Sequence, residues 1–190
     1  MISKDKWQIG QIKERQHHIF SHEEGKKHYD NAYKHYFRYV GLDRDLDGKS
    51  VIEVGSADFP ALGYCENYAM GYVVEPMPSE ILEDICKEKN LVLIKSCAED
   101  YGFPPVDEVW FFNVLQHVLD PDVIIEKAKE AADVIRFFEP IEAGTDQCHH
   151  HEFTMDYFRG HFGGCVKYFE PNQGIKGFHT WQNSYGKWTK

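Results

Sequence analysis

The sequence lacks paired cysteines, long hydrophobic runs and an excess of basic residues. Its five cysteines are odd in number, scattered and free of any C-x-x-C pair. That pattern argues against a disulfide framework and is typical of a reducing compartment. No apolar run approaches the roughly 20 residues that span a bilayer, and residues 1–7 lack the apolar core of a signal peptide. We therefore expect a soluble, cytoplasmic protein without a membrane span.

Acidic residues dominate the charge of the chain. It has 31 acids against 21 bases and a formal net charge of −10. Such a surface repels phosphate backbones unless a basic patch overrides it, and the sequence shows no such patch. Nucleic acid is therefore a disfavoured substrate. The 190 residues, 42% of them hydrophobic and 15% aromatic, are enough for one domain with a proper core.

Residues 1–48 are polar and rich in histidine, and differ in this from the rest of the chain. Apolar side chains recur at helical spacing in the second half of this segment, at Tyr29, Tyr33, Phe37 and Val40. The spacing predicts an amphipathic helix that ends near residue 41. The favoured interpretation is that its stripe packs on the main domain. The alternative is a lid whose aromatic residues shape a substrate pocket.

Strand and helix patterns alternate through residues 49–190. Expected strands cover residues 50–54, 71–74, 91–95, 109–114, 134–138, 165–169 and 178–182, and expected helices cover 78–89, 120–132 and 154–162. Continuous apolar strands separated by helices indicate a parallel sheet covered on both faces. We predict an α/β fold: a Rossmann-like, doubly wound, mostly parallel seven-stranded sheet. An N-terminal helical extension (1–48) precedes this domain (49–190).

Ligands of open parallel sheets bind beyond the carboxyl ends of the strands. The first strand is followed by a turn that contains Gly55, Ser56 and Ala57, and the second strand ends in Glu75 and Pro76. Glycine lets the backbone turn sharply and approach a ligand closely. A carboxylate about 20 residues after such a turn grips a ribose diol in nucleoside-binding sheets. The sequence therefore predicts a nucleoside-bearing ligand at this edge.

Four motifs in the right order carry a family resemblance. They lie at residues 53–57, at Glu75, at 98–100 and at 107–121. The most specific is Leu115-x-His117-Val118-x-Asp120-Pro121. The chain resembles class I S-adenosylmethionine-dependent methyltransferases of a small subgroup over about residues 50–138, with a weaker echo at 151–158. S-adenosyl-L-methionine is the cofactor that the resemblance implies.

The resemblance also implies roles for single residues. It gives backbone contacts with the methionyl group to the turn at Gly55, Ser56 and Ala57, and the ribose hydroxyls to Glu75. Other expected cofactor-site residues are Glu53, Pro76, Cys97, Ala98, Glu99, Asn113 and Val114. Ala98 and Glu99 would meet the adenine and Asn113 would lie beside the methyl donor, while Glu53 would contact the ligand or orient the loop backbone through hydrogen bonds.

The chain departs from the family pattern at three positions. Ala57 and Phe59 stand where members usually carry glycine, so the Phe59 ring would have to point away from the cofactor. Cys97 stands where an aspartate often reads the adenine amino group, and Glu99 or Asp100 would substitute. These departures keep open the alternative of a catalytically inactive, cofactor-binding or partner-binding member.

Histidines are the candidate catalytic residues. His117 has either a packing role or a general-base role, since imidazole titrates near neutrality. His149 and His151 lie in a segment expected over the cofactor site, where one histidine would contact substrate or remove a proton. Neutral imidazoles and thiolates bind zinc, but adjacent histidines point in different directions and no second ligand cluster has a recognised spacing. The sequence therefore predicts no metal site, and it does not determine whether His149–His151 bind a metal.

The function predicted from these residues is S-adenosylmethionine-dependent methyl transfer to an oxygen or nitrogen of a small molecule or glycan. Asn113 is followed by Val-Leu-Gln instead of the Pro-Pro-aromatic sequence typical of nucleic acid methyltransferases. A nucleotide-sugar or nicotinamide enzyme is a further alternative, which the single-glycine turn disfavours. The sequence does not determine the methyl acceptor or the oligomeric state.

Overall fold

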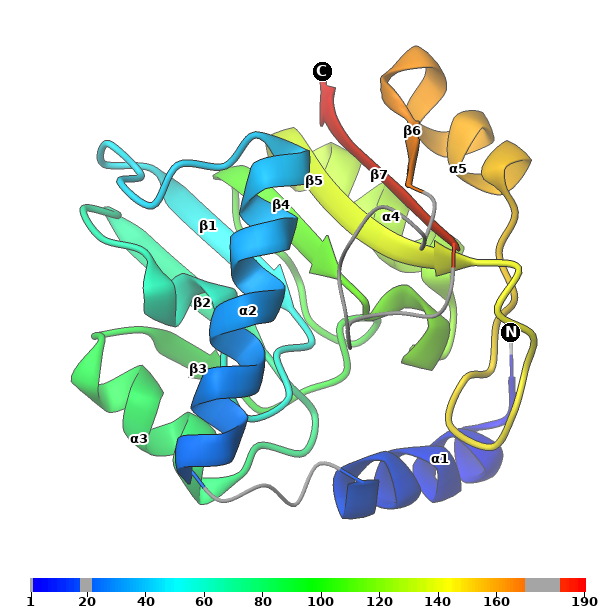
Figure 1. Cartoon of the computed structure of the whole chain (residues 1–190), viewed down its shortest axis with the longest axis horizontal. Helices are drawn as coiled ribbons and strands as arrows, with labels where there is room; N and C mark the ends of the chain where they lie inside the picture. Colours follow the sequence, from blue (N-terminus) through cyan, green and yellow to red (C-terminus); the bar gives the residue numbers. More distant parts are fainter. Residues whose placement is uncertain (1, 18–21, 170–181) are drawn as a thin grey trace.

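A computed structural model describes residues 2–17, 22–169 and 182–190, and shows one seven-stranded sheet (Figure 1). The sheet has the order β3-β2-β1-β4-β5-β7-β6, and β7 runs antiparallel to both of its neighbours. The strands are β1 (Ser50–Val54), β2 (Met70–Val74), β3 (Val92–Ile94), β4 (Val106–Phe112), β5 (Ala132–Ile141), β6 (Lys167–Phe169) and β7 (Gln182–Thr189). The prediction of a doubly wound, mostly parallel sheet is confirmed.

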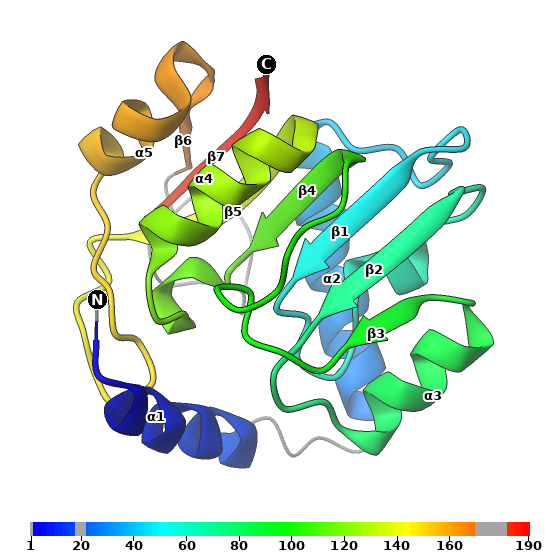
Figure 2. The ribbon, with the colours of Figure 1, turned by 180° about the vertical axis from the view of Figure 1, so that it is seen from behind.

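Helices cover both faces of this sheet. They are α1 (Lys4–His17), α2 (His22–Val40), α3 (Glu80–Glu88), α4 (Pro121–Ala131) and α5 (Met155–Phe162), with short 3-10 helices η1 (Ala61–Tyr64), η2 (Leu115–His117) and η3 (Gly163–Cys165). Figures 1 and 2 show α2 on one face and α4 on the other. Buried side chains of α3 join the core under α2, and those of α5 join the core under α4. None of the described helices is long and apolar enough to cross a membrane.

Strand β1 shows why both faces are covered. Val51 and Glu53 point to the α2 face, whereas Ile52 and Val54 point to the α4 face, since successive side chains of a strand alternate. All four residues are at most 2% exposed. A strand that is apolar on both faces must be buried on both, which is typical of parallel sheets.

The aromatic stripe of α2 packs on the sheet. Tyr33, Phe37 and Val40 are buried in one cluster with Val51 and Trp110. The predicted helix ends where expected, at Val40, and the favoured packing interpretation is confirmed for these side chains. Burying side chains of this size contributes about 1.5–3 kcal/mol each, so α2 is an integral layer of the domain.

A buried ion pair fixes the end of α2 to the sheet. Arg136 on β5 donates from Nε and Nη2 to the two carboxylate oxygens of Glu108 on β4, at 2.6 and 3.1 Å. Its Nη1 donates to the carbonyls of Val40 and Gly41, both at 2.7 Å. Burial opposes ionisation of Glu108, but hydrogen bonds from Arg136, Trp110 and Lys49 lower its pKa to about 2. Arg136 thereby satisfies carbonyls that the helix end leaves open.

Helix α1 was not predicted from the sequence. It lies beyond the carboxyl ends of the parallel strands (Figures 1 and 2). Trp7 is its one large buried hydrophobic side chain among the described residues, whereas Ile9 and Ile12 are 56% and 50% exposed. With so little apolar burial, the helix shows no clear hydrophobic period, which is the main sequence signal for a helix.

Strand boundaries differ from the prediction where the backbone changes conformation. Strand β4 ends at Phe112 instead of residue 114, because Asn113 has a left-handed backbone (φ +58°). Strand β5 continues to Ile141 because it pairs with β7 along its length. The expected strand at 178–182 falls outside the described residues except for Gln182, the first residue of β7. Residues 185–188 belong to β7 and pair with β5, and Tyr185 also pairs with Lys167 of β6.

Candidate cofactor site

The strand order reverses at β1, which has β2 on one side and β4 on the other. The turns after β1 and β4 meet there. Gly55 lies against Val114, so that a Cβ added to Gly55 would approach Val114 Cγ2 to 2.1 Å. Only glycine fits this contact. The crevice of an open parallel sheet lies at such a reversal point, which is where the sequence predicts the ligand.

Both turns at the reversal point use left-handed backbone conformations. Gly55 has φ +66°, Ala57 has φ +48° and Asn113 has φ +58°. Glycine adopts this region without cost and asparagine tolerates it, whereas for alanine it costs about 1–2 kcal/mol. Ala57 therefore keeps the backbone shape that glycine would give to this turn, with some loss of stability.

Glu75 at the end of β2 joins this turn. Its carboxylate accepts a hydrogen bond from the Met77 N–H at 3.1 Å, and the N–H groups of Ser56 and Ala57 lie close enough to act on its pKa. Burial raises its pKa, although these backbone N–H groups and the charge of Arg15 act in the opposite direction. The structure thus brings together the predicted acid and the predicted turn, with Pro76 beside them.

Two other buried glutamates hold the loops around the crevice. Glu53 accepts hydrogen bonds from the N–H groups of Ala61 and Leu62 at 2.7 and 2.8 Å. Glu139, at the end of β5, accepts from the N–H of Val114 at 3.0 Å and from that of Leu115 at 3.2 Å. Burial raises the pKa of Glu53 to about 7 and that of Glu139 to about 8. Glu53 thus fixes the start of η1, and Glu139 fixes the start of η2. For Glu53, these bonds match the loop-orienting role that the sequence analysis gave as one of two possibilities.

Sequence reasoning missed Glu139. It stands within an apolar run, Phe137-Phe138-Glu139-Pro140-Ile141, and a single acid in such a run is a usable signal. A buried carboxylate is costly unless hydrogen bonds satisfy it, so its position at a strand end already indicates a loop anchor.

The segment after β3 is held by its own contacts. The Glu99 carboxylate accepts hydrogen bonds from the N–H groups of Leu119 and Asp120 at 2.7 and 3.0 Å. Lys127 donates to the carbonyls of Ala98, Glu99 and Tyr101. Ala98 is buried and Cys97 is half-buried, and burial raises the pKa of the Cys97 thiol. These bonds fix the loop backbone, and its contact with an adenine stays a prediction.

The ring of Phe59 stacks on Tyr29 of α2, with their centroids 5.3 Å apart. Phe59 is 3% exposed, and its carbonyl accepts a hydrogen bond from the Tyr33 hydroxyl at 2.5 Å. The bulky residue at the family's glycine position is thereby packed against the helical layer. Burial raises the pKa of the neighbouring Tyr29 hydroxyl, and the charges of Asp58, Glu14 and Glu75 add to the effect.

The three predicted histidines lie in two settings. His117 Nδ1 is 3.1 Å from the Cys148 carbonyl, and its ring lies 4.8 Å from the ring of His149. His151 Nε2 lies 2.9 Å from the Val118 carbonyl. The structure therefore brings His117 and His149 together, and gives His151 a bond to the backbone.

Helix α1 roofs this edge. Trp7 Nε1 and Gln11 Nε2 donate to the His117 carbonyl at 2.9 and 3.1 Å. At the other end of the helix, Arg15 Nη1 donates to the carbonyls of Met77 and Pro78 at 2.6 and 3.2 Å. The helix thus spans from the loop after β4 to the loop after β2, over the predicted crevice.

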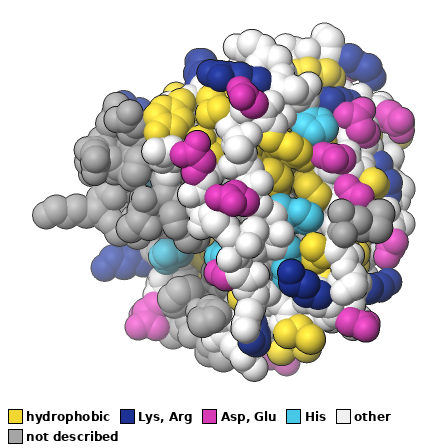
Figure 3. Space-filling view, turned by 90° about the vertical axis from the view of Figure 1, so that its right-hand side faces the viewer, with side chains coloured by type: hydrophobic (Ala, Val, Ile, Leu, Met, Phe, Trp, Pro, Cys, Tyr) yellow, Lys and Arg dark blue, Asp and Glu magenta, His cyan; other side chains and the backbone are white. Residues whose placement is uncertain are grey.

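Gly10 allows α1 to dock closely. A Cβ at Gly10 would lie 2.5 Å from Nε2 of His150. His150 is 7% exposed, and its ring nitrogens have no hydrogen-bond partner among the described residues. Figure 3 shows the side of the molecule that carries α1 and α5, where acidic, basic and hydrophobic side chains are interspersed and several histidines reach the surface.

Several solved structures superpose on this fold. The N-methyltransferase NodS from Bradyrhizobium japonicum WM9 superposes with a TM-score of 0.63 over 85% of this chain and 96% of its own, at 9% identity. The mitomycin 7-O-methyltransferase MmcR superposes with a TM-score of 0.62 over 97% of this chain, at 12% identity. This chain has the class I methyltransferase fold. Both of these neighbours are methyltransferases by name.

A second structure of NodS, in complex with S-adenosyl-L-homocysteine, superposes with a TM-score of 0.59 over 87% of both chains, at 10% identity. The matched region is 60% of the MmcR chain. No protein-family profile matches this methyltransferase-fold chain, and no curated protein matches its sequence. The fold is therefore identified from structure.

Proposed function

We propose that this protein transfers a methyl group from S-adenosyl-L-methionine to an oxygen or nitrogen of a small molecule or glycan. The observation that carries the proposal is the convergence of Glu75 with the Gly55–Ala57 turn at the reversal point of the sheet. A carboxylate accepts two hydrogen bonds from vicinal hydroxyls, and a glycine turn admits a ligand close to the backbone.

The remaining contacts are assigned from the order of the strands. Glu75 and Pro76, after β2, would hold the ribose. The turn after β1, at Gly55, Ser56 and Ala57, would hold the methionyl group, with Glu53 fixing its far end. The segment with Cys97, Ala98 and Glu99, after β3, would line the adenine. Asn113 and Val114, after β4, would form the floor beside the methyl group.

The reaction requires little chemistry from the protein's own side chains. The acceptor atom would attack the methyl carbon, and the carbon–sulfur bond would break with its electron pair left on sulfur. The donor is already activated, so the protein's contribution is in-line placement and exclusion of water. The roof formed by α1 over the strand ends is suited to exclude water from this edge.

A proton leaves the acceptor as the new bond forms. His117 is the best-placed base, because its Nδ1 lies 4.0 Å from a carboxylate oxygen of Glu14, and a carboxylate stabilises an imidazolium. His149 lies beside it, and His151 is bonded to a backbone carbonyl. We therefore assign proton removal to His117 first.

Binding and turnover experiments test this proposal. S-adenosyl-L-homocysteine at 100 times its Kd should stabilise the native protein by about 2.7 kcal/mol, and NAD should not. Radiolabelled methyl transfer to a panel of small hydroxyl and amine compounds tests the chemistry. If S-adenosyl-L-homocysteine stabilises the protein but no methyl group is transferred to any acceptor, the result would support an inactive, cofactor-binding member of the fold. No stabilisation at all would refute the cofactor assignment.

A further inference from the structure

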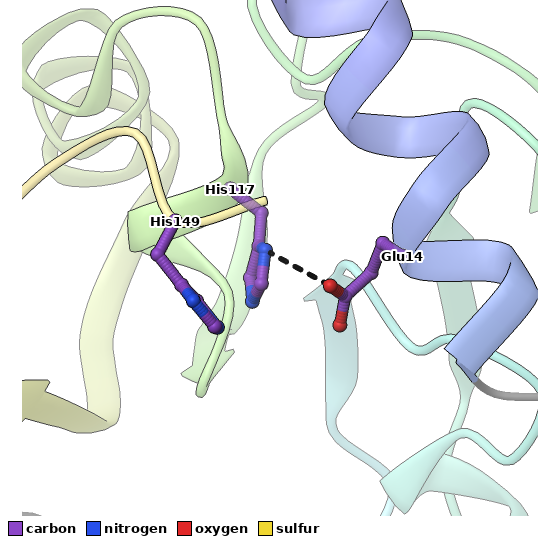
Figure 4. Close-up of side chains that lie close together, drawn as sticks. All are labelled: Glu14, His117 and His149. Carbon is purple, nitrogen blue, oxygen red and sulfur yellow. Dashed lines mark ion pairs between the residues drawn. The ribbon is translucent and has the colours of Figure 1, made fainter. Parts of the chain in front are cut away.

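Three potential metal ligands converge under the roof helix from distant parts of the sequence. Glu14 comes from α1, His117 from η2 and His149 from the segment between β5 and α5 (Figure 4). One ligand atom of each lies within 4.8 Å of the others. The sequence gives no motif for this cluster, because Glu14, His117 and His149 lie in separate elements far apart along the chain. We propose that these three side chains bind a divalent transition metal ion such as Zn²⁺.

The distances are close to those of a metal site. Zinc binds imidazole nitrogen and carboxylate oxygen at about 2.0–2.2 Å, so neighbouring ligand atoms of a tetrahedral ion lie roughly 3.4 Å apart. His117 Nδ1 and Glu14 Oε2 are 4.0 Å apart, and to bind the ion Nδ1 would give up its proton and its 3.1 Å contact with the Cys148 carbonyl. Side-chain rotations that move each atom by less than about 1 Å would complete the geometry. Two imidazoles and one carboxylate are a ligand set that suits zinc and its neighbours in the first transition row.

The surroundings of the cluster also fit a metal. His149 Nδ1 is 2.8 Å from Asp146 Oδ2, which would leave its Nε2 as the ligand atom. Metal-binding histidines commonly have such a carboxylate on the second nitrogen. The side chains of Glu14, His117 and His149 are 25%, 13% and 19% exposed, so an ion can reach them from solvent.

Such an ion would join α1 to the domain. Glu14 belongs to the roof helix, whereas the two histidines belong to loops that come after β4 and β5. Binding to the native state alone raises its stability. An ion bound there would occupy His117, the residue assigned to proton removal, so its effect is measured in the helix itself and not through methyl transfer.

Calorimetric titration of the full-length chain with Zn²⁺ tests the site. We expect one ion per chain at this cluster. Glu14→Gln, His117→Asn and His149→Asn should each weaken binding at least tenfold, since even outer-shell changes at metal sites cost 10–100-fold. His161→Asn is the matched control, because His161 also lies near two carboxylates, at 3.2 Å from Asp122 and 3.6 Å from Glu126. It should bind like the parent.

Hydrogen exchange of α1 provides a second measurement. Zn²⁺ should slow amide exchange in α1 of the parent and leave it unchanged in Glu14→Gln, a substitution of a partly exposed side chain that keeps its shape. Melting in EDTA checks that each variant is folded. The proposal is overturned if Glu14→Gln and His149→Asn bind Zn²⁺ as tightly as the parent, or if His161→Asn weakens binding as much as they do.

Discussion

At the scale of single residues, the turn after β1 depends on two small residues. Gly55 and Ala57 both have positive φ, at +66° and +48°, and a Cβ added to Gly55 would meet the Val114 side chain. Gly55→Ala should therefore destabilise the protein by more than the backbone cost alone, by roughly 2–4 kcal/mol. Urea unfolding measures this loss.

Gly41→Ala is the control for the steric part of that loss. Gly41 has φ +61° with no atom within 4 Å of an added Cβ, so only the backbone cost of about 1–2 kcal/mol applies. Adding Val114→Ala to Gly55→Ala should recover part of the stability. Equal losses for Gly55→Ala and Gly41→Ala would show that the contact with Val114 does not matter.

The same reasoning predicts a stabilising substitution. Ala57→Gly relieves a left-handed alanine, and should raise the free energy of unfolding by up to about 1 kcal/mol, because glycine's larger unfolded-state entropy offsets part of the gain. Thermal unfolding at fixed pH measures it. A drop in stability would mean that the alanine methyl makes a contact worth more than the strain.

At the scale of elements, the Arg136–Glu108 pair links α2, β4 and β5. Arg136→Met leaves the Glu108 carboxylate buried with fewer partners and removes the donor to the last carbonyls of α2. Breaking a buried pair costs about 3–5 kcal/mol. Adding Glu108→Gln should restore part of this loss, because it removes the unbalanced charge.

Exposed Arg38, also on α2, supplies the control. Arg38→Met should change stability by less than about 0.5 kcal/mol. Urea unfolding of the parent and all three variants compares them. If the double variant is no more stable than Arg136→Met alone, the buried charge is not the source of the loss.

Sequence patterns predicted elements best where burial is strong. The strands around the reversal point and the stripe of α2 are apolar on the buried sides, so their periods are plain. Helix α1 was missed because it docks through Trp7, a glycine and polar side chains. Glu139 and Glu14 were missed for a related reason, since a hydrogen-bond partner distant in sequence leaves no local pattern.

At the scale of the whole molecule, the buried glutamates couple stability to pH. The pKa values of Glu53 and Glu139, about 7 and about 8, lie above the 4.5 of an unburied glutamate because of burial. Between pH 4.5 and those values the folded state holds protons that the unfolded state releases. The stability that these two carboxyl groups contribute is fully present below pH 4.5. It is lost as the pH rises from 4.5 through the folded-state pKa values of about 7 and about 8.

Glu139→Gln should therefore flatten the fall of stability between about pH 5 and pH 8. One titrating group contributes a slope of about 1.4 kcal/mol per pH unit. Urea unfolding at about pH 5, 6.5 and 8 measures the slope, and Glu130→Gln, on the exposed side of α4, is the control. If the stability of Glu139→Gln falls with pH as steeply as that of the parent, Glu139 is not the group that titrates in this range.

The central claim is that the β2 acid and the β1 turn hold the adenosyl donor together. Calorimetric titration with S-adenosyl-L-methionine, comparing the parent with Glu75→Ala and with exposed Glu88→Ala as control, tests it most directly. We predict that Glu75→Ala weakens binding at least tenfold while the protein stays folded, and that Glu88→Ala binds like the parent. Equal affinity of the parent and a folded Glu75→Ala variant would contradict the account.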